Sequence, residues 1–69
     1  MNKKNLKLKA ARTLKGLNQA ELAEKVGVTR QTIVAVESGQ YNPTINLCID
    51  ICRELGCTLD QLFWPEDEN

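Results

Sequence analysis

Five helix-breaking residues divide this 69-residue chain into short segments, and they constrain its fold more than any other feature. They are Gly16, Gly27, Gly39, Pro43 and Gly56. Glycine is costly inside a helix and proline cannot continue one, so each segment is expected to end at or near these positions. The segments carry apolar residues three or four positions apart and little of the alternation typical of strands. The sequence therefore predicts an all-α fold of five short helices.

Capping residues bound the first three expected helices. The first spans about residues 6–15 and is stopped by Gly16. The second begins at Asn18, which has the spacing of a capping box with Glu21, and the third is capped by Thr29 and ends near residues 38–39. The apolar residues expected to face the core are Leu6, Ala10, Leu14 and Leu17, then Leu22, Ala23 and Val26, then Ile33 and Val36.

The last two helices are expected after a turn at residues 42–44. Thr58 and Gln61 repeat the capping-box spacing at the start of the fifth helix. The expected inward residues are Ile45, Cys48, Ile49, Cys52 and Leu55 in the fourth helix, and Leu59, Leu62 and Phe63 in the fifth. A single domain over residues 1–69 is expected, with its core in 6–63 and residues 65–69 as a frayed acidic tail.

The composition argues against an enzyme, a metal site or a cofactor. The chain has no His, the usual side chain for acid–base chemistry near pH 7 and the commonest metal ligand. Its three cysteines gather in one stretch, where Cys48 and Cys52 are expected to lie on one helix face as small buried hydrophobes. No signal peptide or membrane span is recognisable, so a cytoplasmic location with reduced thiols is expected.

The net charge of zero hides two oppositely charged halves. Lys and Arg exceed Asp and Glu by 8 − 3 = +5 in residues 1–42, whereas residues 43–69 give 1 − 6 = −5. A basic half is expected of a protein that binds nucleic acid, so it is expected to face DNA. The acidic half leaves open a basic protein partner.

Residues 18–39 hold the most specific motif of the sequence. Two short capped helices are joined by residues 26–28, a connection too tight for an antiparallel pair. Helices joined in this way cross steeply, as in a helix-turn-helix unit. Gly27 supplies the backbone freedom that the turn needs, and Ala23 is small enough for close helix approach.

The run from Asn18 to Ile33, followed by Glu37-Ser-Gly, resembles the Cro and phage-repressor type helix-turn-helix family, also called the xenobiotic-response-element family. The resemblance covers about residues 6–63. It implies a five-helix, lambda-repressor-like domain that binds double-stranded DNA as a homodimer, with the helix at 29–38 in the major groove of a pseudo-palindromic operator. Repression is the expected effect on transcription. An antitoxin or partner-binding module that regulates its own operon is the alternative.

Exposed positions of the third helix supply the candidate base contacts, which are Arg30, Gln31, Val34 and Ala35. Arginine can pair with guanine and glutamine with adenine, and small apolar side chains can pack on thymine methyl groups. Val34 could instead be simply half-buried, and Arg30 could be a solvated surface residue. The candidate phosphate contacts lie at helix starts and in the loop after the third helix, and they are Gln19, Thr29, Thr32, Gln40, Tyr41 and Asn42.

Two further pairs are assigned structural roles. Arg12 and Glu37 stand where the family often holds an ion pair between the first helix and the end of the third. Phe63 and Trp64 are the candidate dimer interface, because large aromatic residues are enriched at interfaces and little sequence follows to cover them. Trp64 could instead fold back on its own core.

Overall fold

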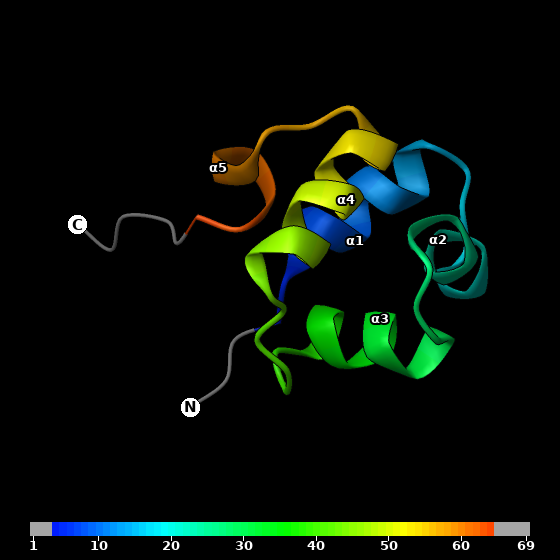
Figure 1. The fold of residues 1–69 in the computed structure, drawn as a ribbon. Coiled ribbons are helices and arrows are strands. Elements are labelled where there is room, and N and C mark those ends of the chain that lie inside the picture. Colours follow the sequence, from blue (N-terminus) through cyan, green and yellow to red (C-terminus); the bar gives the residue numbers. More distant parts are fainter. Residues whose placement is uncertain (1–3, 65–69) are drawn as a thin grey trace.

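The computed structural model describes residues 4–64, and Figure 1 shows how its helices are arranged. Side-chain caps begin four of the five helices. The helices are α1 (Leu6–Leu14), α2 (Gln19–Val26), α3 (Arg30–Ser38), α4 (Ile45–Leu55) and α5 (Leu59–Leu62). The capping side chains are those of Asn5, Asn18, Thr29 and Thr44. Since residues 4–64 contain helices and no strand, the predicted all-α fold of five helices is confirmed. The tail at 65–69 lies outside the described residues.

Gly27 makes the turn between α2 and α3. It adopts a left-handed conformation with φ of 78°, which residues with a side chain rarely adopt. The Val28 N–H then donates to the carbonyl of Ala23 at 2.9 Å, which closes the end of α2. On the α2 side, Asn18 and Glu21 form the predicted capping box, with bonds of 2.7 and 2.9 Å. These local interactions fix where each helix of the motif begins and ends.

The core lies between all five helices. α2 packs against α3 and α4, while α1 packs against α3 and α5. Four aliphatic side chains are fully buried there, and they are Leu8, Leu22, Ile33 and Ile51. Each contributes roughly 1.5–3 kcal/mol of burial free energy, which for a domain of this size is a large share of its stability.

The inward face predicted for α1 is wrong. Leu6 and Leu14 are 65% and 89% exposed, and Ala10 is exposed with them. The buried residues of α1 are Leu8 and Arg12, on the other side of the helix. Apolar periodicity does not predict this face, because Arg12, which shares it with Leu8, is charged.

Two more expected core positions are also wrong. Ile45 at the start of α4 is 61% exposed, and Leu59 at the start of α5 is 37% exposed. In α4 the remaining core positions are filled by Leu47 and Ile51, beside the expected Cys48, Cys52 and Leu55. Each of these two residues is the first of its helix and lies at the surface, although it keeps the spacing of the buried residues that follow. Periodicity alone therefore overestimates burial at these two helix starts.

Asn5 joins three helices at the start of α1. Its side-chain oxygen accepts the Leu8 N–H at 3.0 Å, and its side-chain amide donates to the Leu62 carbonyl of α5 at 2.9 Å. Its backbone N–H donates to the Glu37 carbonyl in α3 at 2.7 Å. One residue therefore links the first helix to the ends of the third and the fifth.

We expect Asn5→Ala to lower the free energy of unfolding by about 1–2 kcal/mol, because it removes both the cap and the bond to α5. Urea unfolding followed by circular dichroism measures the change. Asn5→Ser is the matched control, since it keeps a capping oxygen but is too short to reach Leu62. A serine variant as unstable as the alanine variant would mean that the bond to α5, and not the cap, carries the stability.

Candidate nucleic-acid interface

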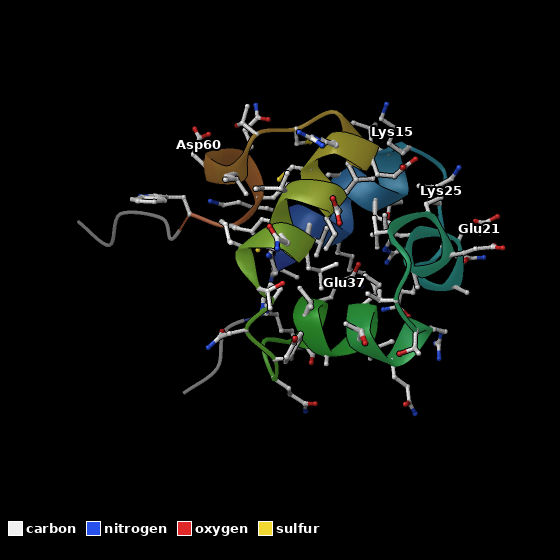
Figure 2. The ribbon with its side chains drawn as sticks, in the orientation of Figure 1. Lys15, Glu21, Lys25, Glu37 and Asp60 are labelled. Carbon is white, nitrogen blue, oxygen red and sulfur yellow. The ribbon has the colours of Figure 1, made fainter. Side chains whose placement is uncertain are left out.

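A buried ion pair ties α1 to the end of α3. Arg12 and Glu37 are 8% and 7% exposed, and the Arg12 Nε lies 2.6 Å from the Glu37 Oε2. The Arg12 Nη2 donates to the other carboxylate oxygen at 3.3 Å, and Nη1 donates to the Leu17 carbonyl at 2.8 Å. Figure 2 shows Glu37 pointing from α3 into the interior. The structure thus places the two residues in contact, in a geometry that satisfies both charges.

Gln19 extends this pair to the surface of α3. Its Nε2 donates to Glu37 Oε1 at 3.1 Å, and its Oε1 accepts from Arg30 Nη2 at 3.2 Å. The carboxylate can only accept and the guanidinium can only donate, so the orientation of the Gln19 amide is fixed. One N–H of that amide remains for an anion at the start of α2. A chain of hydrogen bonds therefore runs from the core to Arg30.

The four candidate base contacts differ in exposure. Arg30 and Gln31 are exposed in the first turn of α3, whereas Val34 and Ala35 are half-buried one turn later. The opposite side of α3 is buried through Ile33 and Val36. The two polar side chains at the start of α3 are therefore accessible to a ligand, and Val34 offers only part of its surface.

The six candidate phosphate contacts fall into two groups. Gln19, Thr29 and Thr32 lie at the starts of α2 and α3, and the Thr29 hydroxyl is 3.1 Å from that of Thr32. Thr29 Oγ1 already accepts the Thr32 N–H as a cap, yet its hydroxyl hydrogen can still be donated. The exposed loop residues Gln40, Tyr41 and Asn42 follow the other end of α3. The two groups therefore flank α3 along its length.

The basic half of the sequence does not form one surface beside α3. Lys15 lies near Gly56 at the end of α4, and Lys25 is 3.8 Å from Glu54. Figure 2 shows both lysines on the side of the molecule away from α3. Part of the +5 half therefore lies away from α3, because folding places Lys15 and Lys25 beside α4.

The two aromatic residues at the end of α5 have different surroundings. Phe63 is half-buried and packs against the core, whereas Trp64 is 70% exposed. The Trp64 carbonyl accepts from Lys7 Nζ at 3.1 Å, which holds this backbone against α1. The fold-back alternative for Trp64 is therefore not what the structure adopts.

Cys48 and Cys52 are buried among apolar groups, whereas Cys57 is half-buried. Burial raises the pKa of the Cys48 thiol, and burial together with the nearby Cys57 raises that of Cys52. A raised pKa keeps both thiols protonated at neutral pH. Within residues 4–64 no three His, Cys, Asp or Glu side chains gather to hold a metal ion. In that same range no helix is long and apolar enough to cross a membrane.

Two capped helices are joined by a tight turn, and the second exposes polar side chains while its opposite side is buried in the core. This arrangement defines a helix-turn-helix DNA-binding domain. The comparison with known families agrees. A family model described as "Helix-turn-helix" matches residues 8–62, and the chain belongs to this family.

Known relatives share the fold and most of the length. The chain is 43% identical to YgzD, an uncharacterised HTH-type transcriptional regulator of Bacillus subtilis, over 91% of this chain and 96% of that protein. It is 44% identical to the uncharacterised HTH-type regulator MJ0272 of Methanocaldococcus jannaschii, over 90% and 94% of the two chains. The restriction-modification controller protein C.AhdI of Aeromonas hydrophila superposes with a TM-score of 0.79 at 32% identity, covering 86% of each chain. The protein is thus a DNA-binding helix-turn-helix transcriptional regulator, and its family is one of DNA-binding regulators and not of enzymes.

The sequence analysis misses the structural roles of two residues, Asn5 and Gln19. An Asn directly before an apolar helical run is a typical cap, so the capping role of Asn5 has a local signal in the sequence. Gln19 is a predicted phosphate contact, and its bond to Glu37 has no local signal because it depends on how α2 and α3 cross.

We expect Glu37→Gln to lower the free energy of unfolding by about 3–5 kcal/mol, because it leaves the Arg12 charge buried without a counter-charge. Chemical unfolding measures this loss. The matched control is Lys25→Ala at the half-exposed pair with Glu54, where we expect at most about 1 kcal/mol. The double variant Arg12→Met/Glu37→Met is expected to lose less stability than the losses of Arg12→Met and Glu37→Met added together. Simple additivity would show that the two residues are not coupled.

Proposed function

We propose that this regulator is a repressor that binds a pseudo-palindromic operator as a homodimer, with α3 in the major groove. The observation that carries the proposal is the hydrogen-bonded chain from Glu37 through Gln19 to Arg30. An exposed arginine is normally mobile, and here it is held at the start of α3 before any ligand arrives. Holding it in advance reduces the entropy lost on binding.

Base readout is assigned to the exposed end of α3. The Arg30 guanidinium can pair with guanine O6 and N7, and the neighbouring Gln31 with adenine N6 and N7. Val34 and Ala35 are half-buried, so each offers only a small surface for contact with thymine methyl groups. The first turn of α3 then carries most of the sequence preference, as in other helices that enter the groove by their N-terminal end.

Phosphate contacts are assigned mainly to neutral groups. Gln19, Thr29 and Thr32 lie where free backbone N–H groups and the positive ends of two helix dipoles favour an anion. The exposed loop at 40–42 provides side-chain donors at the other end of α3. These contacts fix the position of the domain on the duplex and leave sequence preference to α3.

Dimerisation is assigned to the end of α5. Trp64 exposes most of a large aromatic side chain, and Phe63 beside it anchors the segment in the core. One recognition helix reads only a few base pairs, so two copies on half-sites roughly 34 Å apart give useful specificity. A dimer on an inverted repeat that overlaps a promoter excludes polymerase, which supports repression. In this proposal one domain, with its core in 6–63, carries the whole DNA-binding activity.

The proposal predicts that the preference for one base pair in each half-site depends on Arg30. DNA fragments selected from a random library by the purified protein are expected to contain an inverted repeat. With Arg30→Ala we expect the preference at one base pair of each half-site to disappear, at a cost of about 1–3 kcal/mol per half-site. Lys25→Ala, on the side away from α3, is the control and is expected to select the same site. An unchanged preference in the Arg30 variant would reject its role in readout.

The dimer is tested separately. We expect Trp64→Ser to shift the protein toward monomer in sedimentation equilibrium at micromolar concentration, and to weaken operator binding without changing the preferred sequence. Leu14→Ser removes another exposed apolar side chain on a different helix and is expected to leave the association unchanged. A wild-type protein that stays monomeric with and without operator would overturn the homodimer.

A further inference from the structure

α1 carries an apolar face that no other part of residues 4–64 covers. We call it the α1 outer face, and its residues are Leu6, Lys9, Ala10, Thr13 and Leu14, which line a shallow hollow. Leu14 is 89% exposed and Leu6 is 65% exposed. Single exposed leucines are ordinary, but here two leucines and an alanine recur every four residues along one helix. An apolar stripe of this kind is typical of a surface that receives another helix.

The one charged residue that lines the hollow is basic. It is Lys9, and α1 itself contains no Asp or Glu. A partner with acidic side chains beside its apolar stripe would pair with Lys9 while its apolar residues cover Leu6 and Leu14. The face therefore favours an occupant that is apolar in the middle and acidic at the edge.

A second copy of this chain fits the α1 outer face poorly when it docks by the same face. In a two-fold contact centred on this face the axis passes near Ala10, where residues approach their own counterparts, so Lys9 would lie close to the lysine of the other copy. Like charges brought together at an interface oppose binding. The dimer contact proposed above lies instead at Trp64, on α5.

We infer that the α1 outer face docks an amphipathic helix of a partner protein, with acidic residues flanking its apolar stripe. α1 has nine residues and is about 13 Å long, so it matches a partner helix of two to three turns. Leu8 and Arg12 leave α1 on the opposite side, toward the core and α3. None of the side chains assigned to DNA belongs to this face.

The experiment uses a synthetic peptide of about 15 residues, with leucines at helical spacing and glutamates flanking them. The full chain, labelled with ¹⁵N, is titrated with this peptide and the amide shifts are followed by NMR. We expect the shifts to concentrate on α1. A peptide with lysines in place of the glutamates is expected to bind more weakly, and a scrambled peptide more weakly still.

Variants test the two parts of the proposal. Leu6→Ser/Leu14→Ser is expected to weaken the glutamate peptide by about tenfold or more, and its exposed positions allow the protein to stay folded. Lys9→Glu is expected to reverse the preference between the glutamate and lysine peptides. Leu59→Ser, an exposed leucine on α5, is the control and is expected to bind like the wild type.

Four outcomes would overturn the inference. The first is binding of the glutamate peptide no tighter than the scrambled one, and the second is amide shifts centred on Trp64. The third is a change in sedimentation caused by Leu6→Ser/Leu14→Ser, which would show that a second copy covers the face. The fourth is that the protein binds vesicles of anionic phospholipid but not the peptide, and that Leu6→Ser/Leu14→Ser abolishes the vesicle binding.

Discussion

The buried contact between Arg12 and Glu37 is the interaction on which the geometry of the interface depends. It fixes the end of α3 against α1, and the same carboxylate holds Gln19 at the start of α2. The backbone carbonyl of Glu37 also accepts from Asn5. Such a pair need not add net stability, because desolvation offsets much of its attraction. The pair instead favours one orientation of α3, because only there do the two buried charges have partners.

Most of the fold was predictable because its signals are local. Asn18, Thr29 and the glycines after α2 and α3 determine where those helices begin and end through bonds within a few residues. The inward face of α1 was not predictable by counting apolar residues. Leu6, Ala10 and Leu14 make the more regular stripe, yet the core receives Arg12, whose burial depends on Glu37 25 residues away.

The candidate interface was predictable by residue type and less by arrangement. The first turn of α3 is exposed, as the pattern of Ile33 and Val36 indicates, and these two residues are buried. The bond from Gln19 to Arg30 requires α2 and α3 to cross as they do, and no spacing in the sequence encodes it. The same holds for charge. Lys15 and Lys25 belong to the basic half of the sequence, but folding places them near α4.

The position of these lysines changes what attracts the protein to DNA. Lys25 lies beside Glu54, so it is not among the cations at the start of α3, where Arg30 and the positive ends of the α2 and α3 dipoles lie. Partial charges act at short range and are oriented, so they favour a bound phosphate in one position more than a duplex nearby. In the proposed function, weak long-range attraction would keep non-specific binding low, because that binding is almost entirely electrostatic. Selectivity would then come from the geometry that Glu37 sets, and not from the amount of charge that the protein carries.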